Sequence, residues 1–306
     1  MTGSKVKVSK LKSLTGHNDC VYALERSQFP SVFFSGAGDG MVVSWDLKEP
    51  ENGQLIAKLP NSIYGLHYMI NEDVLLVGHN YDGIHIIDWQ EKKELGSLNM
   101  TKAAIFDIKT SNGSAFIGDA SGLLTEVSVN GLSVIKTTKE VDASLRTIDI
   151  NEQKNELAAG YSDNKIRIFE KDSLRLKYVL EGHTNSVFTL KYSPDGQILI
   201  SAGRDAHIRA WDVQAGYLNI QDIAAHMFAI NNIDYSPDGK HFVTCSMDKS
   251  IKVWDSHTFK LLKVIDKARH AGHGTSVNKL LWSSHEHLLV SASDDRAISI
   301  WNLEFT

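Results

Sequence analysis

Residues 182–212 read GHTNSVFTLKYSPDGQILISAGRDAHIRAWD, and this stretch decides the fold. It holds His183 near its start, Ser201 18 residues later, Asp205 four residues after that, and Trp211 six residues further on. The same residue types recur with the same spacing at three other places, so the chain contains an internal repeat. We call each set of four a tetrad. The other tetrads are His17, Ser35, Asp39 and Trp45; His226, Thr244, Asp248 and Trp254; and His273, Ser291, Asp295 and Trp301.

The repeat resembles that of the WD40 family, in which a unit starts near Gly-His and ends at Trp-Asp. The matching ends are Gly16-His17 with Trp45-Asp46, Gly182-His183 with Trp211-Asp212, His226 with Trp254-Asp255, and Gly272-His273 with Trp301-Asn302. The resemblance implies an all-β fold, a β-propeller in which each repeat forms one blade of four antiparallel strands. Apolar runs such as residues 187–192, followed by the turn sequence SPDG at 193–196, agree with short strands and tight turns.

The distance from His17 to His183 is 166 residues, close to four times the spacing of neighbouring repeats, so three further units should lie between them. Seven blades then start near residues 17, 59, 99, 141, 183, 226 and 273, and residues 1–306 form a single propeller domain. The tetrad positions of the three divergent units read Leu59, Val77, Tyr81 and Ile87; Asn99, Ile117, Ser121 and Val127; and Val141, Ala159, Asp163 and Phe169. We expect these units to lose the polar network as a whole, with Asp163 capping turn amides instead.

The last repeat ends at residue 306, too soon to supply its own fourth strand. Residues 11–17, LKSLTGH, match residues 177–183, KYVLEGH, which form the end of a fourth strand in the repeat pattern. Residues 5–14 are therefore predicted to complete blade seven beside Ile298 and Ile300. Such closure would remove the free sheet edges of an open array.

The tetrads contain Ser, His and Asp, which are also the residues of a hydrolase triad. A catalytic triad is needed only once, whereas this set recurs four times with a Trp attached. In the family it resembles, Trp donates to the hydroxyl, the hydroxyl to His, and His to Asp. The resemblance thus implies a structural role for the tetrads, and we expect no catalytic residue, no cofactor and no metal site.

Composition narrows the possible functions further. Hydrophobic residues make up 42% of the chain, the net charge is −5, and there is no extended basic run, so nucleic-acid binding is not favoured. The sequence shows no signal peptide and no membrane-length apolar segment. We therefore expect a cytoplasmic protein, with a nuclear location also open. The two cysteines, Cys20 and Cys245, lack metal-ligand spacing and are expected to be buried, reduced thiols.

The resemblance also implies where partners would bind. In the family, residues three and five beyond the His, and the residue before the turn Asp, often face one opening of the central channel, which we call the mouth. For blade three this frame gives Lys102, Ala104 and Ala120. The candidate partner-binding residues are Tyr22, Tyr64, Arg146, Phe188, Arg204, Asn231, Met247, Asn278 and Asp294.

Aromatic and Arg side chains are enriched in binding hot spots, so the mouth is predicted to bind a protein or peptide that is acidic or can accommodate Arg. The alternative is that the aromatic residues only plug the channel. The overall prediction is a non-catalytic scaffold or adaptor, monomeric within a larger complex. A propeller enzyme with an unrecognised channel site and a nucleic-acid- or chromatin-associated subunit are the alternatives.

Overall fold

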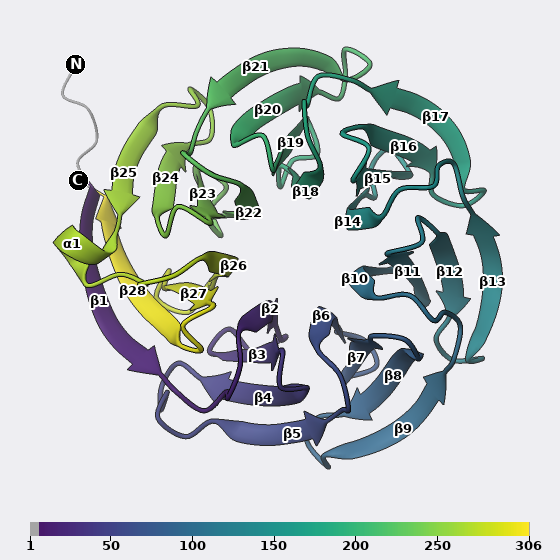
Figure 1. The fold of residues 1–306 in the computed structure, drawn as a ribbon, viewed down its shortest axis with the longest axis horizontal. Coiled ribbons are helices and arrows are strands. Elements are labelled where there is room, and N and C mark those ends of the chain that lie inside the picture. The colour runs from purple at the N-terminus through teal and green to yellow at the C-terminus, as the bar shows by residue number, and fades with distance from the viewer. Residues whose placement is uncertain (1–5, 306) are drawn as a thin grey trace.

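The computed structural model describes residues 6–305 and contains seven four-stranded antiparallel sheets. The sheets are arranged as blades around a central channel, with the first strand of each blade beside the channel (Figure 1). The seven-bladed propeller predicted from the repeat spacing is therefore confirmed.

The strands of the first four blades follow one another along the chain. Blade one contains β2 (Val21–Arg26), β3 (Val32–Ala37), β4 (Met41–Asp46) and β5 (Gln54–Lys58). Blade two contains β6 (Ile63–Met69), β7 (Val74–His79), β8 (Gly83–Asp88) and β9 (Lys93–Leu98). Blade three contains β10 (Ile105–Ser111), β11 (Ser114–Asp119), β12 (Leu124–Ser128) and β13 (Ser133–Thr138). Blade four contains β14 (Leu145–Asn151), β15 (Glu156–Tyr161), β16 (Ile166–Glu170) and β17 (Arg175–Leu180).

The last three blades complete the ring, and blade seven combines strands from both ends of the chain. Blade five contains β18 (Val187–Tyr192), β19 (Ile198–Gly203), β20 (His207–Asp212) and β21 (Leu218–Ala224). Blade six contains β22 (Ile230–Tyr235), β23 (His241–Ser246), β24 (Ile251–Asp255) and β25 (Leu261–Ile265). Blade seven contains β26 (Val277–Trp282), β27 (Leu289–Ser293), β28 (Ile298–Phe305) and β1 (Val6–Leu14). The short helix α1 (Lys267–His270) lies between β25 and β26.

Position within a blade determines how apolar a strand is. All six residues of β7 and all six of β15 are buried, because neighbouring blades cover both faces of these second strands. The outer strand β21 is exposed along most of its length and carries polar residues. The core therefore consists of layers between blades.

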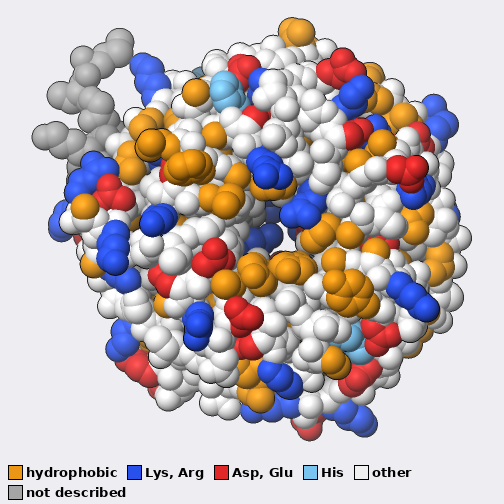
Figure 2. Space-filling model, viewed as in Figure 1, with side chains coloured by type: hydrophobic (Ala, Val, Ile, Leu, Met, Phe, Trp, Pro, Cys, Tyr) orange, Lys and Arg blue, Asp and Glu red, His pale blue; other side chains and the backbone are white. Residues whose placement is uncertain are grey.

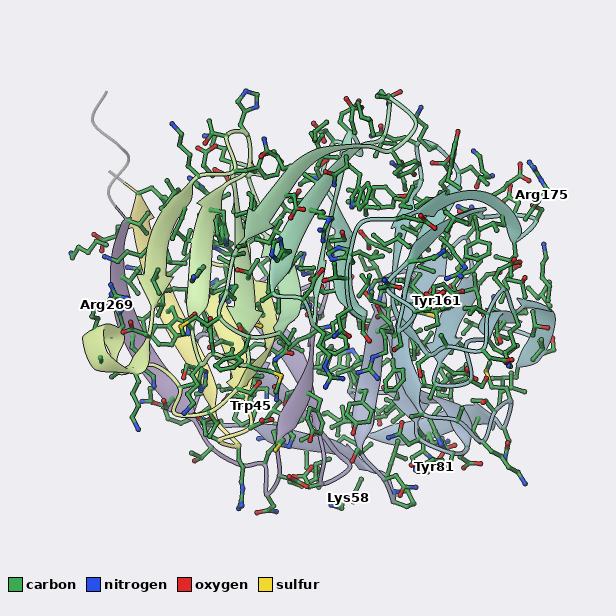
Figure 3. The ribbon with its side chains drawn as sticks, turned by 45° about the horizontal axis from the view of Figure 1, so that its top comes forward. Trp45, Lys58, Tyr81, Tyr161, Arg175 and Arg269 are labelled. Atoms are coloured by element: carbon green, nitrogen blue, oxygen red, sulfur yellow. The ribbon has the colours of Figure 1, made fainter. Side chains whose placement is uncertain are left out.

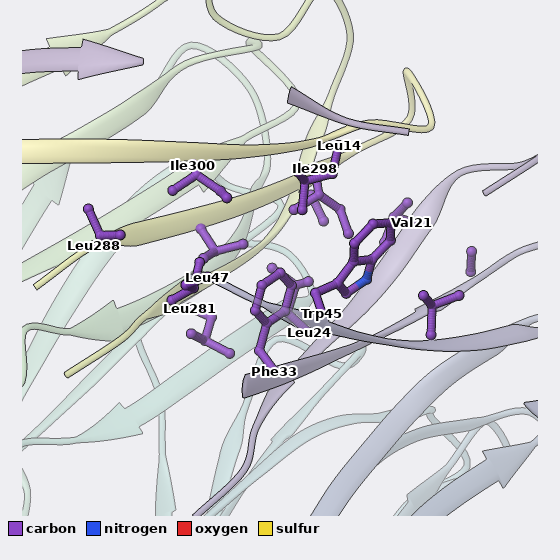
Figure 4. Close-up of a cluster of buried hydrophobic side chains, with 14 residues drawn as sticks. Leu14, Val21, Leu24, Phe33, Trp45, Leu47, Leu281, Leu288, Ile298 and Ile300 are labelled. Atoms are coloured by element: carbon purple, nitrogen blue, oxygen red, sulfur yellow. The ribbon is translucent and has the colours of Figure 1, made fainter. Parts of the chain in front are cut away.

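The ring closes through β1, which pairs antiparallel with β28 and places Leu14 opposite Ile298 and Lys12 opposite Ile300. Leu14 and Ile298 are buried in a cluster that also contains residues of blade one, including Phe33 (Figure 4). Closure by the N-terminal strand is confirmed. Residue 5, which we included in this strand, lies outside the described residues.

Six of the blades follow the predicted frame, since their first strand begins four residues after the predicted start. Blade three does not: β10 begins at Ile105, so Thr101 rather than Asn99 occupies the position of the tetrad His. The frame there shifts by two residues, and Phe106, not Ala104, is its fifth position.

Neither cysteine forms a disulfide. Cys245 is fully buried, as expected, but Cys20 is only half-buried, because it lies in the loop before β2. Burial raises the pKa of both thiols. The helical part of the described chain offers nothing long enough to span a membrane.

Candidate functional site

Hydrogen bonds connect the members of each tetrad. The hydroxyl oxygen lies 2.7–2.8 Å from the His Nε2 and 2.8–3.0 Å from the Trp Nε1 in blades one, five, six and seven. The His Nδ1 lies 2.9 Å from the Asp carboxylate in the last three of these blades. In blade one the corresponding distance, from His17 to Asp39, is 3.4 Å. The four side chains join the two middle strands to the loop that enters the blade.

The carboxylates of the tetrads in blades five, six and seven stay ionised to low pH. Burial opposes ionisation of Asp295, but the hydrogen bond and charge of His273 and the amides of Ala297 and Gly274 outweigh it, and they lower its pKa to about 2. The pKa values of Asp205 and Asp248 are likewise held well below the usual range, against burial, by His183 and His226. Every tetrad hydroxyl is buried and already engaged by His and Trp.

The divergent blades do not lose the whole network. Blade two has Tyr81 at the expected Asp position, but Asp82 follows directly and lies close to two histidines. In blade three, Asp119 precedes the expected position and accepts hydrogen bonds from Thr101 Oγ1 at 2.7 Å and from Ser121 Oγ at 2.7 Å. The expectation of a complete loss is wrong for the carboxylate, because each turn keeps one with new partners.

Blade four shows the same principle with a different partner. Asp163 was expected to cap turn amides, and the amide of Lys165 does donate to it at 3.3 Å. Its main partner is Arg167, whose guanidinium donates to both carboxylate oxygens at 2.7 and 3.1 Å. The same guanidinium lies 4.6 Å from the centre of the Tyr161 ring. A guanidinium has thus replaced the imidazole of the intact blades.

Aromatic and Arg side chains form a continuous arc around the mouth. The Tyr22 and Tyr64 rings have centroids 4.8 Å apart, and the Tyr64 and Phe106 centroids are 5.9 Å apart. The Arg146 guanidinium lies over Phe106 at 4.0 Å and over Phe188 at 5.1 Å. All five side chains are half-buried, so the arc is a preformed rim. Phe106 was missed in the sequence because of the two-residue shift in blade three.

Amide side chains complete the mouth over blades six and seven. Asn231 donates to the carbonyl oxygen of Val277 at 2.8 Å, and Asn278 donates to the carbonyl oxygen of Val21 at 3.1 Å. Asn278 also donates to Asp294 at 2.8 Å. Asn231 and Asn278 therefore bridge neighbouring blades, and the side chains of all three predicted site residues are engaged within the chain.

Three strongly exposed apolar side chains of this face lie together on blade six. Met227, Phe228 and Met247 are 82%, 60% and 52% exposed. The amide of Met247 donates to the carbonyl oxygen of Ala229, which joins the two loops that carry them. Only Met247 was among the predicted site residues. We call Met227, Phe228 and Met247 the blade-six patch.

The blade-six patch borders the turn of blade five that carries Arg204. The amides of Ala225 and His226 donate to the carbonyl oxygen of Ala206 in that turn. Arg204 itself is exposed. Figure 2 shows hydrophobic side chains gathered around the central opening, with Lys or Arg side chains beside it.

Four stretches of the chain match the model of a known protein family. The family model for the WD domain, G-beta repeat, matches residues 8–46, 174–212, 219–255 and 263–302, which together make up just over half of the chain. The chain belongs to the WD40 family. Each matched stretch contains one intact tetrad.

Several curated proteins match this WD40 chain in sequence at low identity. It is 25% identical over 306 residues to the 66 kDa stress protein of Physarum polycephalum, covering 96% of this chain and 48% of that protein. It is 23% identical to the APC/C activator protein CDH1 of Saccharomyces cerevisiae (66% and 36% covered) and 27% identical to the F-box-like/WD repeat-containing protein TBL1X of Mus musculus (64% and 40%). The chain spans about half the length or less of these relatives.

A solved structure, the WD40 β-propeller domain of Doa1, superposes with a TM-score of 0.85 at 17% identity, covering 97% of each chain. At that identity the match supports the fold.

The propeller also has a charged cavity in the channel, on the side away from the mouth, that the sequence frame did not reveal. Its volume is about 590 Å³, and its lining includes Lys109, Lys191 and Lys279. Six acidic residues also line the cavity: Glu25, Glu72, Asp107, Asp149, Glu152 and Asp234.

Three of these carboxylates hold neighbouring blades together. Asp107 accepts from the amide of Ile148 at 2.8 Å, Asp149 from the amide of Tyr192 at 2.8 Å, and Asp234 from the amide of Trp282 at 2.7 Å. Burial opposes ionisation of Asp107, but nearby lysines and this amide outweigh it and lower its pKa. Inter-blade hydrogen bonding therefore explains why these three carboxylates line the channel.

Proposed function

We propose that this propeller is a non-catalytic scaffold that binds a protein or peptide through its mouth face, as one component of a larger complex. The observation that carries the proposal is the blade-six patch, three large apolar side chains that are more than half exposed. Clustered exposed apolar residues mark interaction sites more often than isolated ones do. Met side chains also adapt to varied partner surfaces.

The rest of the mouth face supports the same proposal. Arg204 is exposed beside the patch and is free to pair with a carboxylate of the partner. The half-buried arc from Tyr22 to Phe188 adds a rigid rim whose conformational entropy has already been lost, so binding against it costs less. An apolar partner segment flanked by acidic residues fits both features.

The alternatives receive less support. A channel enzyme would need free acid or base groups, and three channel carboxylates are already bound by amides of the neighbouring blade. The net charge of −5 disfavours a nucleic-acid partner. None of the three relatives named above is named as an enzyme.

The patch can be tested with a double variant, Phe228→Ala with Met247→Ala. Both side chains are exposed, so we expect the free energy of unfolding to change by less than about 1 kcal/mol. Partners are first identified by affinity capture from the source cells, and the dissociation constant of each is then measured. The double variant should lose about 2 kcal/mol or more of binding free energy.

Leu218→Ala is the matched control, because Leu218 is also 61% exposed but lies on the outer strand β21. It should retain every partner that the double variant loses.

Arg146→Ala tests the rim separately. It should lower the free energy of unfolding by about 1 kcal/mol and weaken binding of the same partner. Equal binding by all variants would refute the proposal.

A further inference from the structure

We propose that His79, Asp82 and His85 form a binding site for a divalent transition-metal ion of the zinc class, at the mouth-face turn of blade two. His79 ends β7, Asp82 lies in the turn, and His85 is the third residue of β8. One ligand atom from each of the three lies within 4.8 Å of the others. Two imidazoles and a carboxylate are a known ligand set of zinc sites in which the protein supplies three ligands and leaves the fourth position open.

The three ligand atoms surround a common point. Asp82 Oδ2 lies 3.6 Å from His79 Nδ1 and 4.0 Å from His85 Nε2. Bonds of about 2.0–2.2 Å in a tetrahedral zinc site place ligand atoms roughly 3.4 Å apart, so each ring needs to move by about 1 Å or less. The Asp82 side chain is 46% exposed and can adjust.

His79 has an unsatisfied nitrogen that points to a ligand. Its side chain is only 5% exposed, yet Nδ1 has no hydrogen-bond partner among residues 6–305. A buried nitrogen without a partner is costly, and a bound cation would satisfy it.

The surrounding groups orient the ligands as outer residues do in metal sites. His85 Nδ1 lies 3.0 Å from Glu94, so its opposite nitrogen, Nε2, is directed toward Asp82. Asn99 donates to Asp82 Oδ1 at 2.6 Å and leaves Oδ2 available. A carboxylate behind a ligating His fixes the tautomer and increases the basicity of the ring.

A purely structural role would look different. In the intact blades one His meets one carboxylate, and the second ring nitrogen is bound by a hydroxyl. In blade two a pair of rings, with centroids 5.4 Å apart, shares one carboxylate. Tyr81, within the same turn, is 62% exposed and is labelled at the lower edge of the molecule in Figure 3. The Asp82 side chain is itself 46% exposed, so an ion can reach it from solvent.

The test uses the full chain without a histidine tag, first treated with a chelator and then titrated with Zn²⁺ against a chromogenic chelator. We expect one tightly bound Zn²⁺ per chain and a higher melting temperature with the ion. Co²⁺ should give the intense visible bands of a tetrahedral site. Absence of stoichiometric Zn²⁺ binding would overturn the proposal.

Variants locate the site. His85→Gln and Asp82→Asn should abolish the tight binding and the Zn²⁺-dependent rise in melting temperature. Glu94→Gln changes only an exposed orienting residue, so it should fold normally and bind Zn²⁺ about 10–100-fold more weakly. That variant keeps the test decisive if a ligand substitution prevents folding.

His207→Gln is the matched control. His207 Nδ1 lies 2.6 Å from Asp222 on the neighbouring strand of blade five. Among the described residues, this pair is not part of a three-residue group like that of blade two. It should bind Zn²⁺ like the unchanged chain. Unaltered binding by both His85→Gln and Glu94→Gln would place the ion elsewhere and refute the assignment.

Discussion

Blades five, six, seven and one form one arc of the ring, and blades two, three and four form the other. In the first arc a buried polar network joins the strands of each blade. In the second, apolar side chains fill the hydroxyl and Trp positions of every blade and the His position of blades two and four. The remaining carboxylate of each turn has a different partner in each blade. One backbone architecture is thus stabilised in two chemically distinct ways.

The contrast teaches that the network is replaceable only as a unit. Removing one partner leaves a buried polar group unpaired, at a cost of about 1–3 kcal/mol, whereas replacing all partners together can be nearly neutral. In blade two, Leu59, Val77 and Ile87 are all buried and join one hydrophobic cluster. The turn carboxylate persists because each divergent blade supplies a new partner for it: Asn99 in blade two, Thr101 in blade three and Arg167 in blade four.

The largest effect should come from removing β1, which tests whether an intact network can hold blade seven without its fourth strand. Blade two draws its fourth strand, β9, from its own segment, whereas blade seven depends on the other end of the chain. Deleting residues 1–14 exposes the edge of β28 and the buried Ile298 and Ile300. We expect a much lower melting temperature and aggregation.

A chain lacking only residues 1–5 serves as the control, because it keeps β1 whole. It should have the same melting temperature as the full chain. If the chain lacking residues 1–14 also had that melting temperature, closure would contribute little to stability, and the tetrad of blade seven would be enough to hold the blade.

The fold could be predicted from the sequence because the tetrad spacing is fixed by blade geometry. The frame failed by two residues in blade three, where none of the His, Ser or Trp markers remains to set it. Thr101 and Asp119, which hydrogen-bond to each other, could have corrected it, but their residue types alone do not identify them.

Parts of the candidate site were less accessible to sequence reasoning. Met227 and Phe228 lie in a loop, and their exposure depends on how that loop packs, which the repeat pattern does not encode. His79 and His85 lie on either side of the expected Asp position, so the frame passed over them. The channel carboxylates become visible only when the seven inner strands are placed side by side.

The second-largest loss of stability is expected when the tetrad of blade five is replaced by the residue types of blade four. Trp211→Phe alone keeps most of the buried ring but removes a donor to Ser201, and it should cost about 1–3 kcal/mol of unfolding free energy. Adding Ser201→Ala and His183→Val recreates the apolar set of blade four. The triple variant should lose less stability than the three single variants combined.

Arg209 gives the converted blade five the same carboxylate partner that blade four has. It already donates to Asp205 at 3.1 Å, as Arg167 does to Asp163 in blade four, so the carboxylate keeps a partner after His183 is removed. Denaturant unfolding of all variants measures the coupling. Additive losses would contradict the view that the network is replaced as a unit.

The smallest effect should be the pH dependence contributed by a single tetrad carboxylate. The pKa of Asp295 is about 2 in the folded chain, whereas an unfolded Asp titrates near about 3.9. The folded state therefore keeps the carboxylate ionised where the unfolded state binds a proton. The stabilisation by Asp295 is fully present above about pH 4 and is lost as the pH falls toward about 2.

Asp295→Asn should therefore be less stable than the unchanged chain at about pH 5, and the difference should shrink as the pH approaches about 2. Asp142→Asn is the control from the divergent arc, since Asp142 pairs with Lys139 at 2.6 Å but its side chain is 93% exposed and screened by water. Denaturant unfolding at several pH values gives both differences. A gap for Asp295→Asn that stays constant with pH would mean that the carboxylate acts only as a neutral hydrogen-bond acceptor. The tetrads would then stabilise their arc by geometry alone, and charge would no longer distinguish them from the apolar packing of blades two to four.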